Sequence, residues 1–125
     1  MTESTSSNCG ENVQFTRQLL ALQGRDIRSA IAVQKPYMER RIWATIRQQW
    51  PELDLTVTSP QLSWEAYPTE DISRSFVTHA VLGDLQRIMT YPKLGYMTPQ
   101  TIPDSVQTAF DFLIEAGFTN HLLPT

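Results

Sequence analysis

The feature that most constrains the fold is a strand–helix–strand run in the first half of the chain. Ser29–Gln34 is short and its central residues are apolar without alternation, which is typical of a strand buried on both faces of a parallel sheet. Pro36 suits the first position of a helix, and the helical pattern that follows ends at Pro51. Alternating Leu53, Leu55 and Val57 then predict a second strand, exposed on one side or near an edge. Strands joined by a helical crossover lie parallel, so the fold class is α/β.

Apolar spacing predicts three further helices. Glu11–Gln23 repeats apolar residues at helical intervals, and Gly24 stands where a glycine stops a helix. Asp71–Thr90 predicts a long helix, and a last one runs from Pro103 to Gly117. We therefore expect one domain over residues 1–125, with a mainly helical C-terminal region over residues 71–125.

The number of strands is itself informative. Two parallel strands do not make a stable sheet alone, because an independent sheet needs three or more. We therefore expect that an N-terminal strand–helix portion of the fold is missing. A truncated reading frame and a homo-oligomer whose partner completes the sheet are the alternatives.

Charge and cysteine content exclude several classes of protein. The net charge of −3 and pI of 5.3 argue against a nucleic-acid-binding protein. Cys9 is the only cysteine and cannot form an internal disulfide, and no Cys/His spacing indicates a metal site. No apolar run approaches the roughly 20 residues that span a bilayer, so no membrane insertion is expected. The N-terminus lacks a signal-peptide pattern, which predicts a cytoplasmic protein.

A polar, glycine-containing loop at residues 4–12 runs directly into the first predicted helix. Backbone N–H groups and the positive end of the helix dipole suit an anionic or polar ligand there. The same residue types also serve as ordinary helix caps, and that interpretation stays open. The candidate ligand-binding residues of this loop are Ser6, Asn8, Cys9, Glu11 and Asn12.

A second polar loop, Gln34–Arg41, follows the first predicted strand and carries three cations. In open α/β sheets, ligands bind outside the carboxyl ends of the strands. Successive helical residues point about 100° apart, so only one of the two arginines is expected to face such a crevice. The alternative is that the cations of this loop lie on a solvated helix surface, where Glu39 is their counter-charge. The candidate residues are Gln34, Lys35, Arg40 and Arg41.

These two loops carry a resemblance to a known family. The pattern Ser6-x-Asn8-Cys9-x-Glu11-Asn12 resembles the Ser-x-Asn-Thr-x-Glu-Asn signature of the YdcF-like family. Pro36, Tyr37, Arg40 and Arg41 match its Pro-aromatic-x-x-Arg-Arg pattern, and many members have His where this chain has Met38. Residues 83–88 and 91–95 resemble the C-terminal region of soluble members. Most members have Thr in place of Cys9, which favours a hydrogen-bonding role for Cys9 over a nucleophilic one.

The resemblance implies a Rossmann-like three-layer α/β/α fold that lacks the family's N-terminal strands here. It also implies S-adenosylmethionine as a cofactor candidate and, through the membrane-anchored members, a role in envelope and peptidoglycan maintenance. No reaction is implied, so whether the chain is an enzyme stays open.

The sequence therefore indicates two candidate functions. The first is binding of a small nucleotide-like or S-adenosylmethionine-like molecule at the carboxyl ends of the parallel strands. The second is a non-catalytic interaction or regulatory module related to the cell envelope. The chain contains no Gly-x-Gly-x-x-Gly, Walker or Gly-x-Ser-x-Gly motif, which argues against the common dinucleotide, phosphate-loop and hydrolase sites.

Overall fold

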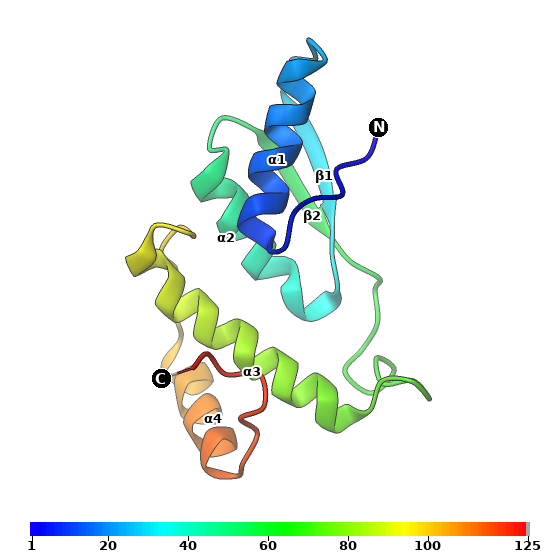
Figure 1. Cartoon of the computed structure of the whole chain (residues 1–125). Helices are drawn as coiled ribbons and strands as arrows, with labels where there is room; N and C mark the ends of the chain where they lie inside the picture. The colour runs from blue at the N-terminus through cyan, green and yellow to red at the C-terminus, as the bar shows by residue number, and fades with distance from the viewer. Residues whose placement is uncertain (125) are drawn as a thin grey trace.

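The computed structural model describes residues 1–124 and shows a mixed α/β protein (Figure 1). Four α-helices, two short 3₁₀ helices and two strands make up the described part of the chain. In chain order they are α1 (Cys9–Leu22), β1 (Ser29–Val33), η1 (Pro36–Met38), α2 (Glu39–Gln49), β2 (Asp54–Thr58), α3 (Arg74–Thr90), η2 (Tyr91–Leu94) and α4 (Asp104–Glu115).

The predicted strand–helix–strand unit is confirmed. Strands β1 and β2 pair in parallel, with Ser29 opposite Asp54 and Val33 opposite Thr58. Helices α1 and α2 cover one face of this two-stranded sheet (Figure 1). Alternate strand residues point into the core beneath them, as the two-residue period of a strand requires. The core consists of Val13, Ile42, Ile46 and Leu53, with Ala30, Ala32, Leu55 and Val57 packed against it.

Strand β1 differs from its prediction. Its residues alternate between exposed and half-buried, and the side chains of Ile31 and Val33 are each 70% exposed. The expectation of a strand buried on both faces is therefore wrong for the described chain, because helices cover only one face. Strand β2 agrees with its prediction, since Asp54 and Thr56 are exposed while Leu55 is half-buried. A third layer is not seen within residues 1–124.

Helix α1 begins at Cys9, two residues before the predicted start, because Asn8 caps it. The Asn8 side chain accepts a hydrogen bond from the Glu11 backbone N–H. The helix ends at Leu22, one residue before its predicted end, with Gln23 as the C-cap. Gly24 then has the φ of 67° that is accessible mainly to glycine, as expected for the residue that stops the helix. There Gly24 and Arg25 donate backbone hydrogen bonds to Ala21 and Leu20, which satisfies carbonyl groups at the helix end.

Helix α3 begins at Arg74 rather than at the predicted Asp71. Ser73 caps it by accepting a hydrogen bond from the Phe76 backbone N–H over 3.1 Å. The preceding residues form a turn instead, in which the Ile72 backbone N–H bonds the Thr69 hydroxyl. The helix crosses below the end of the sheet at which both strands finish (Figure 1). It therefore occupies part of the edge where a ligand crevice was expected.

Helices α3 and α4 form the larger part of the described C-terminal region, residues 74–124. Helix α4 starts after Pro103 and ends near Gly117, and the chain then returns along α3. The backbone carbonyl of His121 accepts a hydrogen bond from Arg87, and the Leu123 N–H bonds Gln86. This return brings the chain so close to α3 that a Cβ on Gly83 would lie 2.5 Å from the His121 oxygen. Only glycine fits there without movement of the returning segment.

Candidate functional site

The N-terminal turn of α1 and one face of α2 line an open cavity of about 380 Å³, which we call the α1–α2 cleft. It brings together four of the residues that the sequence predicted to bind a ligand, from two loops about thirty positions apart. Two of its lining residues are tyrosines from the segment after α3. The lining residues are Asn8, Cys9, Gly10, Glu11, Gln14, Arg41, Thr45, Gln49, Tyr91 and Tyr96.

The first turn of α1, which lines this cleft, contains backbone N–H groups without a partner. Asn8 accepts from the Glu11 N–H, and the Asn12 N–H bonds the Asn8 carbonyl. Within residues 1–124 the N–H groups of Cys9 and Gly10 have no hydrogen-bond partner. Unsatisfied N–H groups at the positive end of a helix suit an anion or a carbonyl oxygen.

Glu11 is held by its own loop. Its carboxylate accepts hydrogen bonds of 2.8 Å from both the N–H and the hydroxyl of Ser7. These bonds, the one from the Ser7 backbone foremost, lower the pKa of Glu11. The carboxylate is therefore ionised and oriented at neutral pH. The bonds to Ser7 tie the residue before the cap to the first turn of α1, and they place a fixed negative charge at the rim of the cleft. The helix-cap role that the sequence left open belongs to Asn8.

A carboxylate that the sequence did not single out organises the residues before α1. Glu3 accepts hydrogen bonds from the N–H and hydroxyl groups of Thr5 and Ser6. The Asn12 side chain donates to Glu3 and to the Ser6 hydroxyl. Led by the Ser6 hydroxyl, these bonds lower the pKa of Glu3 to about 2. Ser6 and Asn12 thus fold the N-terminal segment and are not among the residues that line the cleft.

Arg41 forms an ion pair with Asp84 of α3, its Nη1 lying 2.9 Å from Oδ1. The two side chains are only 16% and 9% exposed. Burial raises the pKa of the Asp84 carboxyl, against the charge and hydrogen bond of Arg41 and the charges of Arg87 and Lys35. Among the described residues, Arg41 Nε and Asp84 Oδ2 are buried and have no partner. Arg41 therefore reaches the cleft with part of its charge already compensated.

Asp84 is the main residue that the sequence prediction missed. It lies in the buried register of α3, one turn after Ala80 and one turn before Ile88. A carboxylate at a core position of a helix is unusual, because burial of an unpaired charge is unfavourable. A carboxylate at a core position therefore predicts a buried cationic partner. The sequence does not indicate which cation pairs with Asp84.

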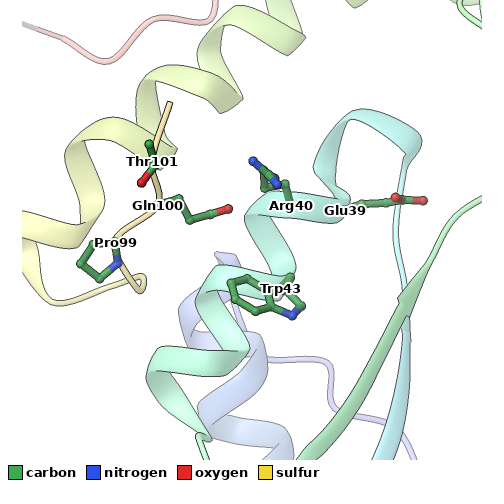
Figure 2. Close-up of a pocket in the computed structure, with 6 residues that line it drawn as sticks. All are labelled: Glu39, Arg40, Trp43, Pro99, Gln100 and Thr101. Atoms are coloured by element: carbon green, nitrogen blue, oxygen red, sulfur yellow. The ribbon is translucent and has the colours of Figure 1, made fainter. Parts of the chain in front are cut away.

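Arg40 lies in a different cavity, on another side of α2. This second cavity, of about 570 Å³, is lined by Glu39, Arg40, Trp43, Pro99, Gln100 and Thr101 (Figure 2). The expectation that only one of the two arginines faces a given crevice agrees with this arrangement. Arg40 and Arg41 are adjacent in sequence but line separate cavities because the helix turns about 100° between them.

The loop after β1 does not join the cleft. Gln34 lines a cavity of about 280 Å³ beside β1, together with Asn12. The Gln34 side chain accepts a hydrogen bond from the Lys35 N–H, and Lys35 is exposed. At the carboxyl ends of both strands, Pro36 and Ser59 line another hollow of about 430 Å³. The predicted crevice is thus divided among several hollows, and Gln34, Lys35, Arg40 and Arg41 do not converge.

Cys9 is half-buried and packs against the core of Val13 and Ile42.

Within residues 1–124 no group of three or more His, Cys, Asp or Glu side chains could hold a metal ion. In the same described part of the chain, no helix has both the length and the apolar character needed to cross a bilayer.

The sequence has a relative that is longer than this chain. Over 124 residues, or 99% of the chain, it is 36% identical to an uncharacterised protein of Streptomyces coelicolor. The chain spans 56% of the length of that relative. No family model matches the chain, and no solved structure matches it. The match includes both predicted ligand loops, but the name of the relative assigns no activity to them.

Proposed function

We propose that the α1–α2 cleft binds a small polar molecule that carries an anionic group, of the nucleotide-like or S-adenosylmethionine-like kind. The observation that carries the proposal is the convergence of Asn8, Cys9, Glu11 and Arg41 on one cavity. Its volume of about 380 Å³ is in the range of small-molecule sites, which are about 300–1,000 Å³.

Each wall of the cleft offers a different interaction. The unpartnered N–H groups of Cys9 and Gly10 would receive a carboxylate or phosphate. Tyr91 and Tyr96, whose rings meet edge to face with centroids 5.4 Å apart, would pack against a planar ring. The Glu11 carboxylate would accept from ribose hydroxyls or attract a sulfonium cation. No nucleophile with a base beside it lies in the cleft, so the proposal is binding and assigns no reaction.

S-adenosylmethionine is the first probe because the motif resemblance to the YdcF-like family implies it. Adenosine monophosphate and adenosine are the comparison ligands, with and without the anionic group. We expect the anionic or zwitterionic molecules to raise the melting temperature with concentration, since a ligand that binds the folded state stabilises it.

Two cleft variants make the test specific. Tyr96→Ala removes an exposed ring from the wall, and Glu11→Gln removes the rim charge. Gln48→Ala, on the exposed face of α2, is the matched control. Weaker binding in both cleft variants but not in the control would support the proposal. Equal stabilisation of all four proteins, or none by any of these ligands, would overturn it.

A Rossmann-like three-layer architecture is part of this proposal. It is supported by helices α1 and α2 on one face of the sheet and by the bare apolar side chains of Ile31 and Val33 on the other. A buried parallel sheet has both faces covered. Cytoplasmic location and an envelope-related regulatory role stay predictions.

The same bare face favours a second candidate function, association with another copy of the chain that packs over this face. Light scattering of the purified protein tests it directly. We expect a dimer for the wild type and a monomer for the double variant Ile31→Lys/Val33→Lys. Leu22→Lys, at an equally exposed apolar position on α1, is the control. A monomeric wild type would overturn this candidate and leave the ligand proposal untouched.

A further inference from the structure

We propose that the second cavity, between α2 and the Pro99–Thr101 loop, is a separate binding site for an aromatic ring that carries one anionic group. Its volume of about 570 Å³ exceeds that of the α1–α2 cleft. Figure 2 shows Arg40 and Trp43 on the helix side and Gln100 on the loop side, facing one another across the cavity. An aromatic surface, a cation and an amide thus surround one space.

Trp43 supplies the surface for a ring. Its side chain is 40% exposed although its neighbours Ile42 and Ala44 are buried. A partly exposed indole in a concave surface is a favourable place for another aromatic ring to stack, because stacking removes apolar area of both partners from water. The residue lies three positions after Arg40, so the two side chains share one face of α2.

Arg40 supplies the charge. Within residues 1–124 its guanidinium has neither an ion-pair nor a hydrogen-bond partner. The Glu39 carboxylate is hydrogen-bonded to the Ser59 hydroxyl, and Figure 2 shows it directed away from Trp43 and Gln100. Arg40 is therefore available to a carboxylate or phosphate, which its planar donor groups fit well. The nearby Glu39 charge favours a ligand with a single negative charge over one with several.

Gln100 supplies a polar contact that the protein itself leaves unused. Its Nε2 is buried and has no partner within the described residues. A buried amide donor is normally satisfied. Figure 2 shows the oxygen of this amide directed toward Arg40, and rotation of the amide would bring Nε2 to a ligand oxygen in the cavity. The loop that carries it is held against α2, since the Thr98 N–H bonds the Ala44 carbonyl over 3.1 Å and Met97 is buried beside Ala44. The wall of the cavity is thus formed before a ligand arrives.

The test uses 4-fluorobenzoate as the probe. Binding is followed by the ¹⁹F signal of the probe and by the indole N–H signal of Trp43, which is assigned by comparison with Trp43→Leu. We expect the probe to shift the Trp43 signal, whereas acetate and 4-fluorobenzyl alcohol, which lack the ring or the charge, do not. No shift of the Trp43 signal at saturating probe would overturn the proposal.

Variants locate the contacts. Arg40→Gln and Gln100→Leu should each weaken probe binding, by roughly tenfold for the arginine, which is the scale of a lost charge-assisted hydrogen bond. Arg25→Gln, at an exposed cation on the turn after α1, is the control.

Tyr96→Ala in the α1–α2 cleft should leave probe binding unchanged, which separates this site from the proposed function. Equal weakening by Arg25→Gln would show non-specific attraction to positive charge and overturn the proposal. Melting curves of each variant report whether it is folded.

Discussion

The Arg41 guanidinium of α2 and the Asp84 carboxylate of α3 form a buried ion pair over 2.9 Å. It joins the strand–helix–strand unit to the C-terminal helical region at the end of the sheet where both strands finish. Within residues 1–124 each of these charges has one ion-pair partner and leaves one buried atom unpaired. The pair therefore fixes the relative position of two helices at the edge of the proposed ligand cleft.

Removing one partner of this pair should be far more harmful than replacing both. Asp84→Ala leaves the Arg41 charge buried alone, and we expect it to lower the free energy of unfolding by about 3–5 kcal/mol. The double variant Arg41→Met/Asp84→Leu, which buries apolar groups instead, should be close to the wild type or more stable. Urea unfolding measures both. Equal losses in the single and the double variant would contradict this account.

Glu3 should titrate far below an ordinary glutamate. Its pKa of about 2 in the folded protein, against a usual 4.5, means that it contributes stability above pH 4.5. That contribution should be lost as the pH falls from about 4.5 towards 2, when the hydrogen bonds to Ser6 and Thr5 are given up. The ¹³C shift of the Glu3 carboxyl followed against pH gives the midpoint. Ser6→Ala should move it upward, and a wild-type midpoint near 4.5 would rule out the hydrogen-bonded arrangement.

Gly83 should tolerate no side chain. A Cβ there would lie 2.5 Å from the His121 carbonyl oxygen and 2.8 Å from the His121 Cβ. We expect Gly83→Ala to displace the segment that returns along α3 and to cost about 1–3 kcal/mol in stability, the usual scale of overpacking. Gly10→Ala is the matched control, because its Cβ would meet nothing closer than 3.4 Å. Thermal unfolding and amide exchange at Leu123 report the effect. Similar melting temperatures for the two variants would argue against the close approach.

Asn8 should stabilise α1 through its cap. Asn8→Ala leaves the Glu11 N–H without its acceptor and should lower stability by about 1 kcal/mol. Asn8→Ser and Asn8→Asp keep a capping oxygen and should restore most of the loss. Chemical denaturation of the three variants makes the comparison. If all three were equally destabilised, the side chain would act through something other than the cap.

Helix and strand positions followed from local signals. Periodic apolar residues predicted four helices and two strands, and Gly24 and Gly117 marked two helix ends where positive φ is observed. The start of α3 was misplaced by three residues, because the turn at Thr69 competes with the helix and Ser73 provides the cap. Helix boundaries depend on single hydrogen bonds, which residue spacing does not specify.

The sequence by itself determined the parallel strand–helix–strand unit, because hydrophobic period and the proline and glycine positions act over a few residues. It also identified Asn8, Cys9, Glu11 and Arg41 as candidates without showing that they share one cavity. Only the tertiary structure decided that Arg40 and Arg41 line different cavities, that Asp84 pairs with Arg41, and that Ile31 and Val33 are exposed. Contacts between residues more than forty positions apart depend on how whole helices pack. The direction of a side chain and the cover over a strand are properties of that packing, and local sequence does not encode them.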